Sequence, residues 1–471
     1  MASSRVRVME TSLVSPAAGP DAVPARSVAL TFFDVKWLHL PPVERVFLYR
    51  LSPDADVAAI VAGLKASLAQ ALRAFYPLAG RVCVARRSSS IRHELRYRPG
   101  DAVPFTTAEY ECDMDKLLAS DEPVRVAALA PLVPQLPKGR AVLAVQATTT
   151  ICSSSSSSRI ISGLAVGVTV HHSACDGAGS THFLHTWAAW ACGAGGADHQ
   201  KPPALDRAAL IPDPRGLYDT YLRSLPPRIA DDAAFEFVSK PPEAYQDKLL
   251  ATFTLPKGLL EKIKAAVAAE AARRGIAPPP RCSTTLAAYA LMWSCYCRCR
   301  RSTTTSSNNT CYFLFSVDQR ARLMNPPVPA TYLGNCLCPA IATAPEDHLA
   351  APGIIAGLFA ASTAVAAALE EQVREGAQDT WDTCVDRVSQ GVAHGMLSVA
   401  GSPRFRVYDL DFGFGRPAKV AMVSAAKGGA MPIAEARAGA GVEVAVSLPA
   451  DGMERFQNTF ADAIACLSSA A

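Results

Sequence analysis

Apolar residues recur along the chain with two different spacings. Between Val57 and Phe75 they repeat at helical spacing, and the run stops just before Pro77. Because the residue before a proline disfavours the helical conformation, this pattern predicts an amphipathic helix that faces a core. The runs 142–150 and 163–170 are β-rich and lie on either side of a serine-rich spacer. They predict two strands joined by a solvated loop.

The second half of the chain alternates between strand-like and helix-like runs in the same way. Strands are predicted at 249–255 and 311–317, near Val420 and at 441–448, and helices at 258–274, 283–299, 353–369, 381–391 and 453–465. A stretch rich in Gly, Pro and Asp, from Gly193 through Pro227, has the composition of a linker. The sequence therefore predicts a mixed α/β protein with an N-terminal domain over 1–210, a crossover linker over 211–235 and a C-terminal domain over 236–471.

The composition is that of a folded protein with a large core. Of the 471 residues, 50% are hydrophobic and 19% are charged, which excludes a disordered chain. Lys and Arg number 46 against 42 Asp and Glu, and the net charge of +4 is spread along the chain. Because no basic block is present to neutralise a run of phosphates, nucleic acid is not an expected partner.

The cysteines and the N-terminus predict a cytoplasmic protein. The 14 cysteines follow no regular framework, and the N-terminus lacks the apolar core of a secretory signal. The uncharged stretch 353–369 is dominated by Ala and Gly and ends at Glu370. Alanine contributes little to membrane insertion and the stretch is barely long enough, so we expect a soluble Ala-rich helix and no membrane partner.

The densest chemical signal follows the strand predicted at 163–170. The run ends in His171 and His172, followed by Asp176 and Gly177. A neutral imidazole at the exit of a buried strand suits a general base, so His172 is our first candidate, with Asp176 either orienting the ring or anchoring the loop. The alternative is that both histidines are structural. A metal site is disfavoured, because adjacent residues on a strand face opposite sides and no third ligand lies nearby.

A second unusual segment runs from Tyr408 to Pro417. Gly413 and Gly415 alternate with aromatic residues, which permits sharp turns, and Asp411 is placed to fix the loop through side-chain hydrogen bonds. The tripeptide that begins at Asp411 also occurs in protein kinases, but the chain has no glycine-rich loop and no ATP-binding lysine strand to accompany it. Taken alone, the segment predicts a structural turn.

These two segments together resemble the motifs of one family. Residues 172–177 resemble the HxxxDG motif of the plant BAHD acyltransferases, and residues 411–415 resemble their DFGWG motif, with Phe414 in place of Trp. These enzymes transfer acyl groups from coenzyme A thioesters. Residues 332–336 are similar to the YFGNC signature of the members that acylate glycosides of flavonoids, anthocyanins and simple phenols, with Leu333 in place of Phe.

The resemblance implies a two-domain chloramphenicol-acetyltransferase-like fold with the active site in a channel between the domains. His172 would deprotonate the acceptor hydroxyl, which would attack the thioester carbonyl without an acyl-enzyme. Asp176 would turn away from the substrate and pair with Arg320. Asp411, the third residue of the implied catalytic set, would support the shape of the channel from its loop, together with Gly413 and Gly415.

The resemblance also implies where coenzyme A binds. Arg281 and Ser283 lie at the start of a predicted helix, at the position that the family uses near the pantetheine and the phosphates. A guanidinium beside hydroxyls and free backbone N–H groups suits an anion, although an ordinary capped helix accounts for the same residues. Lys257, with Lys262 and Lys264, forms a nearby basic face that would meet the phosphates.

We therefore predict a cytoplasmic, monomeric, coenzyme A-dependent O-acyltransferase of plant secondary metabolism, with acyl-CoA as co-substrate and no permanently bound cofactor or metal. Malonyl-CoA is the favoured donor, and a sugar hydroxyl of a phenolic, flavonoid or anthocyanin glycoside is the favoured acceptor. The alternatives are a hydroxycinnamoyl-CoA-dependent O- or N-acyltransferase, a thioester hydrolase and a silent binding protein of the same fold. Residues 178–180 provide no cation for a malonyl carboxylate, so that charge must come from elsewhere in the chain.

Overall fold

The computed structural model describes residues 6–19, 22–87, 90–119, 122–153, 159–193, 201–225, 241–280, 282–300, 309–322, 327–375 and 381–469. They form two compact units. Unit 1 comprises Met1–Tyr245, Met324–Cys336 and Phe405–Ala425, and unit 2 comprises Gln246–Leu323, Leu337–Arg404 and Ala426–Ala471.

The units differ from the contiguous domains expected from the sequence. Two segments of the second half, 324–336 and 405–425, belong to unit 1. The physical reason is visible in their contacts: Asn335 binds Asp34 through its backbone and side chain, and Lys419 pairs with Leu48 in an antiparallel ladder. Of the expected linker 211–235, residues 217–224 form a helix, and residues 226–235 lie outside the described part of the chain.

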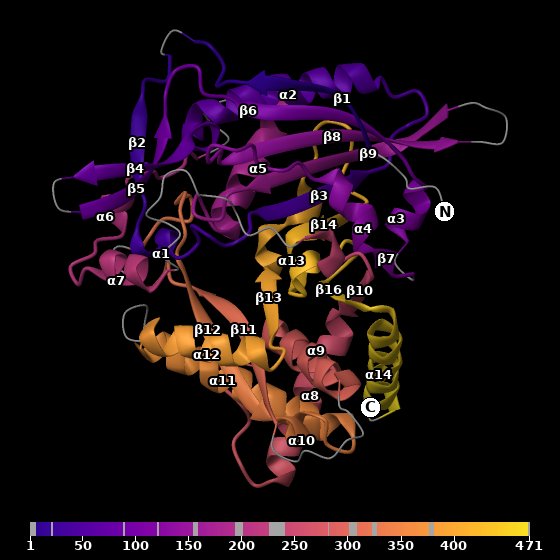
Figure 1. Cartoon of the computed structure of the whole chain (residues 1–471). Helices are drawn as coiled ribbons and strands as arrows, with labels where there is room; N and C mark the ends of the chain where they lie inside the picture. The colour runs from indigo at the N-terminus through magenta and orange to yellow at the C-terminus, as the bar shows by residue number, and fades with distance from the viewer. Residues whose placement is uncertain are drawn as a thin grey trace. The chain divides into compact units, whose positions relative to one another are not determined.

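A mixed sheet forms the centre of unit 1 (Figure 1). Within the described residues its strands follow the order β1 (Val6–Val14), β6 (Val103–Glu111), β8 (Leu143–Ser153), β9 (Arg159–Val170), β3 (Val43–Tyr49) and β14 (Lys419–Met422). The predicted pair of strands around the serine-rich spacer is confirmed, since β8 and β9 run antiparallel over their length. β9 is central, because β3 pairs with its other edge.

Helices and a smaller sheet complete unit 1. The small sheet has the order β2 (Arg26–Ala29), β5 (Ser90–Tyr97) and β4 (Arg81–Arg87). The helices are α1 (Phe32–Val35), α2 (Val57–Ala74), α3 (Met114–Leu118), α4 (Val126–Leu129), α5 (Gly177–Ala191), α6 (Arg207–Leu210) and α7 (Leu217–Ser224), with a two-residue strand β7 (Val124–Arg125). The helix predicted from Val57 is thus confirmed. It packs against α5, where Nε1 of Trp187 donates to the carbonyl of Leu64 over 3.1 Å.

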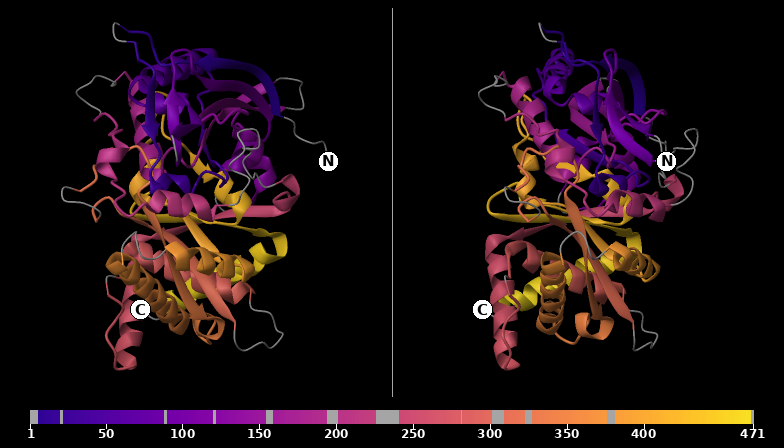
Figure 2. Two further views of the ribbon diagram at one scale, coloured as in Figure 1. Left: turned by 60° about the vertical axis from the view of Figure 1, so that its left-hand side comes forward. Right: turned by 90° about the vertical axis from the view of Figure 1, so that its left-hand side faces the viewer.

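Unit 2 has its own sheet, flanked by helices (Figures 1 and 2). Among the strands that belong to unit 2, the order is β12 (Leu337–Pro345), β11 (Thr310–Asp318), β13 (Leu397–Gly401), β15 (Met431–Glu435), β16 (Gly441–Pro449) and β10 (Lys248–Pro256). The helices are α8 (Lys257–Arg273), α9 (Thr284–Arg300), α10 (Glu346–Leu349), α11 (Ile354–Glu375), α12 (Trp381–Ala393) and α14 (Ala450–Ser469), and α13 (Val423–Gly428) contains the boundary between units. The mixed α/β organisation is confirmed.

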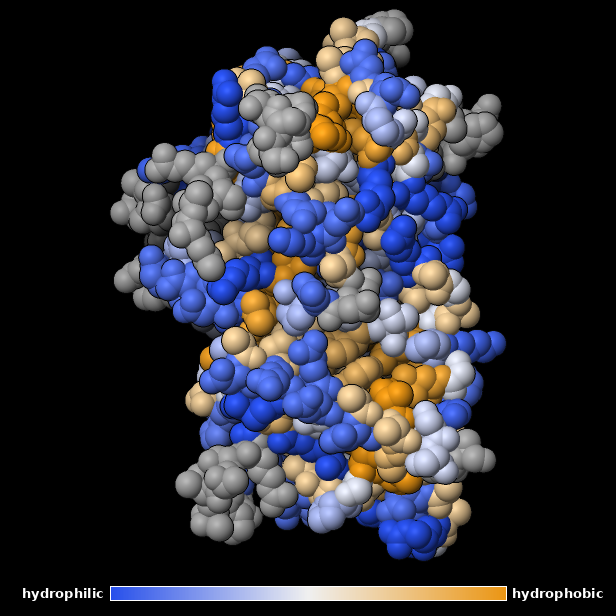
Figure 3. Space-filling view, turned by 90° about the vertical axis from the view of Figure 1, so that its right-hand side faces the viewer, coloured by the Kyte–Doolittle hydropathy of each residue, from blue (hydrophilic) through white to orange (hydrophobic). Residues whose placement is uncertain are grey.

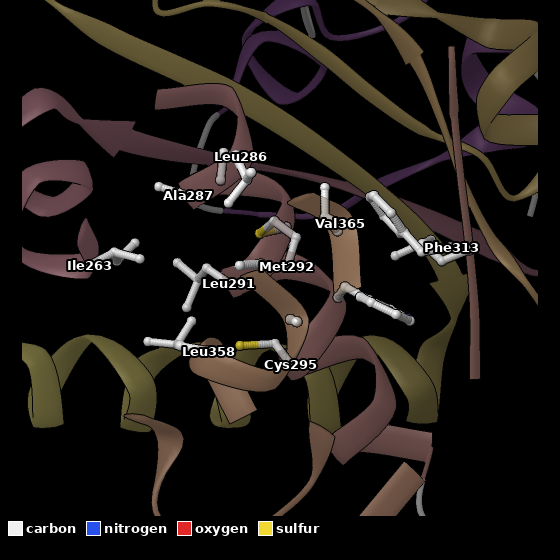
Figure 4. Close-up of a cluster of buried hydrophobic side chains, with 14 of the residues drawn as sticks. Ile263, Leu286, Ala287, Leu291, Met292, Cys295, Phe313, Leu358 and Val365 are labelled. Atoms are coloured by element: carbon white, nitrogen blue, oxygen red, sulfur yellow. The ribbon is translucent and has the colours of Figure 1, made fainter. Parts of the chain in front are cut away.

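The core of unit 2 forms where α9 meets α8, α11 and the sheet. Figure 4 shows Leu291 and Met292 of α9 between Ile263, Leu358 and Phe313. The cysteines of α9, at 295, 297 and 299, belong to this core and are buried. Such a densely filled interior fixes α9, so that the residues at its start are held in a defined place.

Within the described residues, two helices have the length and apolar character needed to cross a membrane, Val57–Ala74 and Ile354–Arg374. Both pack against other elements: α2 lies on α5, and α11 contributes Leu358 and Val365 to the core of unit 2. Core packing buries half of the apolar stretch of α11 and 28% of that of α2. On the face shown in Figure 3, hydrophilic and hydrophobic residues are interspersed, which is ordinary for a protein surface.

Candidate active site

The candidate base lies on the turn between β9 and α5, in unit 1. β9 ends at Val170, and the N–H of His171 continues its pairing by donating to the carbonyl of Val142 over 2.8 Å. The N–H of Ala174 then donates to the carbonyl of His171 over 2.9 Å, which closes the turn before α5 begins. A buried strand paired on both sides thus presents the two histidines at its exit, as the sequence predicts.

The two histidines have different environments. His171 is fully buried, and its Nδ1 accepts hydrogen bonds from the N–H and Oγ of Ser173, at 3.2 and 2.9 Å. Burial lowers its pKa to about 3, with smaller effects from His172, His39 and Arg140. His171 is therefore a neutral structural residue at physiological pH, which is the role that the alternative interpretation gave to both histidines.

His172 is partly exposed, and its ring stacks on Trp37. The two ring centroids are 3.7 Å apart and the ring planes differ by 6°. Burial lowers the pKa of His172 below its ordinary value, opposed by its own backbone carbonyl, Asp176 and Asn335, while Lys36 lowers it further. The imidazole is therefore neutral at physiological pH, which is the state in which it can accept a proton.

Asp176 connects the turn to two backbone segments. One carboxylate oxygen caps α5 by accepting from the N–H of Gly179 over 3.0 Å, and the other accepts from the N–H of Cys336 over 3.0 Å. The side chain is 1% exposed. These bonds give Asp176 an anchoring role, one of the two that the sequence left open. The predicted ion pair with Arg320 joins residues of different units and stays a prediction; within unit 2, Nη1 of Arg320 lies 3.2 Å from Asp318.

The glycine after Asp176 is explained by a close contact. A Cβ atom on Gly177 would lie 2.5 Å from Cε2 of Phe405. Phe405 is held in turn by its carbonyl, which lies 3.0 Å from Nε2 of His185 on α5. Any side chain at position 177 would push this ring away from the start of α5.

The structure confirms that Asp411 fixes its own loop. One carboxylate oxygen accepts from the N–H groups of Gly413 and Gly415, at 2.8 and 2.9 Å. Both glycines have positive φ angles, 94° and 101°, which other residues rarely adopt. Phe412 packs its ring 4.6 Å from that of Trp187 on α5. Asp411 is thus a supporting residue of unit 1. Among the residues of the implied catalytic set, its role is to fix the shape of its own loop.

The candidate phosphate-binding residues lie in unit 2, around the start of α9. Ser283 caps this helix by accepting from the N–H of Leu286 over 3.2 Å, and Nζ of Lys264 lies 3.3 Å from Oγ1 of Thr284. Lys257 is exposed at the start of α8. Lys262 is about 140° around the helix from Lys257, so the three lysines do not form one face. The predicted Arg281 lies outside the described residues.

Several residues that contact the turn were not predicted from the sequence. Trp37 stacks on His172, and Asn335 donates from Nδ2 to the carbonyl of His172 over 2.9 Å. Behind them lies a buried ion pair between Asp34 and Arg207. A signal for Asp34 was present, because a carboxylate within the apolar run 30–35 requires a buried partner. Nothing in the sequence indicated that Arg207 is this partner.

Comparison with known proteins places these observations in context. A sequence model of the Transferase family matches residues 4–463. The chain is 32% identical to phenolic glucoside malonyltransferase 1 of Arabidopsis thaliana, over 96% of each chain. It is 31% identical to the malonyl-CoA:anthocyanidin 5-O-glucoside-6''-O-malonyltransferase of the same plant, over 97% of this chain and 98% of the relative. A coumaroyl-CoA:anthocyanidin 3-O-glucoside-6''-O-coumaroyltransferase from that plant is 28% identical, over 96% of each chain.

The fold is also shared with solved structures. The crystal structure of vinorine synthase superposes with a TM-score of 0.65 at 20% identity, over 96% of each chain. TRI101 of F. graminearum, complexed with coenzyme A and deoxynivalenol, gives a TM-score of 0.61 at 15% identity, over 92% of this chain and 97% of TRI101. The two-domain fold implied by the sequence resemblance is therefore confirmed.

The buried, neutral His171 predicts a loss of stability in acid. The unfolded state takes up a proton near pH 6.5, whereas the folded state does so only near pH 3, so stability falls as the pH drops below 6.5. Between about pH 7 and about pH 5, His171 alone should account for about 2 kcal/mol of this loss. In His171→Asn, the amide oxygen can still accept from Ser173 but does not titrate. Urea unfolding of both proteins at the two pH values should show a smaller loss for the variant; equal losses would contradict the assignment.

Proposed function

Because the chain belongs to the BAHD acyltransferase family, we propose that it transfers a malonyl group from malonyl-CoA to a sugar hydroxyl of a phenolic or anthocyanin glycoside, with His172 as general base. That it is an acyl-CoA-dependent acyltransferase follows from the family and from relatives that span nearly its whole length. The choice of malonyl donor and glycoside acceptor is supported by what its relatives are named for.

The observation that carries the mechanism is the environment of His172. It is neutral, partly exposed, stacked on Trp37 and held at the end of a central strand. In the proposed reaction, Nε2 of His172 accepts the proton of the acceptor hydroxyl as its oxygen attacks the thioester carbonyl. The new C–O bond forms, the C–S bond breaks, and the imidazolium returns the proton to the departing thiolate, giving the ester and free coenzyme A.

The malonyl donor requires a cation near the reacting carbonyl, and Lys36 is a candidate. Lys36 is the cation whose charge lowers the pKa of His172. Its Nζ lies 5.3 Å from the centroid of the Phe33 ring and 5.9 Å from that of Trp37, the ring on which His172 stacks. A carboxylate two bonds beyond the thioester carbonyl would reach this part of unit 1. We therefore assign the missing cation to Lys36.

A hydroxycinnamoyl donor is the second candidate, because a coumaroyltransferase is among the similar relatives. A coumaroyl group has no carboxylate, so it gains nothing from Lys36. It is instead a flat aromatic group, for which the indole of Trp37 offers a stacking surface. The donor experiment below separates the two candidates.

Removal of the base is the direct test of the mechanism. In His172→Gln, transfer should fall by about 10²–10⁴-fold, because general-base catalysis contributes a factor of this size. The melting temperature should change little, since the side chain is partly exposed. The matched control is His394→Gln, which removes an exposed histidine of unit 2 and should transfer at the wild-type rate. Free coenzyme A is measured with malonyl-CoA, with and without a glycoside acceptor. Near wild-type transfer by His172→Gln would refute the mechanism, and release without acceptor would indicate a hydrolase.

Replacement of Lys36 tests the donor. In Lys36→Met, kcat/KM for malonyl-CoA should fall by about 10- to 100-fold, the size of a lost charge-assisted hydrogen bond. The value for acetyl-CoA should change little. The rates are compared at about pH 8. Removal of a cation raises the pKa of His172, so the acid limb of the pH–rate profile moves to higher pH. Lys116→Met, at a surface lysine whose side chain is 80% exposed, is the control. An equal effect on both donors would show that Lys36 does not bind the malonyl carboxylate.

A further inference from the structure

A buried ion pair lies directly behind the turn that carries His172. Nη1 of Arg207 is 2.9 Å from Oδ2 of Asp34, and the two side chains are 1% and 0% exposed. Burying two charges is costly unless every donor and acceptor is satisfied. Oδ2 of Asp34 also accepts from the N–H and Oγ1 of Thr31, each at 2.8 Å. Nε and Nη2 of Arg207 donate to the carbonyls of Leu333 and Ala174, at 3.0 and 2.5 Å.

The other oxygen of Asp34 fixes the side chain of Asn335. Oδ1 of Asp34 accepts from the backbone N–H of Asn335 over 2.8 Å and from its Nδ2 over 2.9 Å. The same Nδ2 donates to the carbonyl of His172 over 2.9 Å. Because this end of the amide faces two acceptors, it must be the NH₂ group, and the orientation of the amide is determined.

This orientation leaves one buried acceptor and one buried ring nitrogen without a bond of normal geometry. Within the described residues, neither Oδ1 of Asn335 nor Nδ1 of His172 has a hydrogen-bond partner, and both atoms are buried. They belong to two residues that are already joined, because Nδ2 of Asn335 donates to the backbone carbonyl of His172. An unmet buried polar atom costs about 1–3 kcal/mol, so a hydrogen bond between these two atoms would satisfy both.

We propose that Asn335 is the positioning residue of the base: its Oδ1 accepts a hydrogen bond from Nδ1–H of His172, which leaves the lone pair on Nε2 free to take the proton of the acceptor. This inference rests on the proposed role of His172. The ion pair of Asp34 and Arg207 acts indirectly, because Asp34 sets the direction in which the side-chain amide of Asn335 points. A base held by a third group in this way is a recurring arrangement in catalysis.

Two observations support the proposed tautomer. The interaction with the Asn335 side chain raises the pKa of His172, as expected if the amide oxygen stabilises the protonated ring. The carbonyl of His172 itself acts in the same direction. The stack on Trp37, with 6° between the ring planes, restricts the tilt of the imidazole. Asp176, Lys36 and His171 are the other groups whose charges act on or respond to this ring.

The tautomer can be observed without substrate. In ¹⁵N-histidine-labelled protein, the nitrogen shifts of His172, assigned by their absence in His172→Gln, report which ring nitrogen carries the proton. For the wild type we expect the proton on Nδ1. A proton on Nε2 would overturn the proposal. The measurement is independent of transfer, so it also separates this proposal from the role of His172 as base.

The variant Asn335→Ala tests the residue itself. We expect the tautomer with the proton on Nε2 to predominate and kcat to be about 10- to 100-fold lower with little change in the donor KM, because only the minor fraction of base with a free Nε2 reacts. The acid limb of kcat/KM should move to lower pH, because an interaction that raises the pKa of His172 is lost.

Thr31→Val is the matched control for a merely structural effect. It removes a buried hydrogen bond to the same carboxylate of Asp34 but leaves the contact between Asn335 and His172 in place. It should lower the melting temperature while the wild-type tautomer and acid limb are retained. If Asn335→Ala shows the wild-type tautomer and acid limb, Asn335 does not position the base. If Thr31→Val alters both as much as Asn335→Ala does, the effect belongs to general destabilisation and the proposal is wrong.

Discussion

The buried ion pair between Asp34 and Arg207 organises unit 1 around the turn that carries the candidate base. Its charges are far from water, so each must be satisfied by the backbone around it. The groups that satisfy them come from distant parts of the sequence: Thr31 in the N-terminal segment, Ala174 in the turn itself, and Leu333 and Asn335 in a segment that follows most of unit 2. Because the buried charges of Asp34 and Arg207 require hydrogen bonds from residues 333 and 335, this short segment belongs to the first unit.

The same environment determines the chemistry available at the turn. Burial favours neutral imidazoles, and both His171 and His172 have pKa values below the ordinary one. Only His172 is partly exposed, so only it can meet a substrate while remaining an acceptor of protons. Asp176, despite its place in the motif, uses both carboxylate oxygens to bind backbone N–H groups. The division between one reactive and several supporting residues therefore follows from burial and from hydrogen bonding.

Features with a local cause could be predicted from the sequence. The helix from Val57, the strands on either side of the serine-rich spacer and the Asx-type turn at Asp411 are each encoded within a few neighbouring residues. Features that depend on distant partners could not. The edge strand Val6–Val14 pairs with residues 103–110 and carries exposed apolar residues. The spacing of its apolar residues alone therefore does not show which face of the strand is buried. Arg207 lies in a stretch with linker-like composition, and only its contact with Asp34 reveals a buried role. Likewise, a motif identified His172, but not the indole and the amide that hold it.

The central claim is that His172 acts as a base on the acceptor and never carries the acyl group. Intact-protein mass spectrometry of the wild type, quenched at short times after mixing with malonyl-CoA in the absence of acceptor, tests it most directly. The account predicts that the protein keeps its unmodified mass at all times, and that coenzyme A is released in quantity only when a glycoside is added. A stoichiometric malonyl adduct on the protein, formed without acceptor and discharged when the glycoside is added, would contradict it.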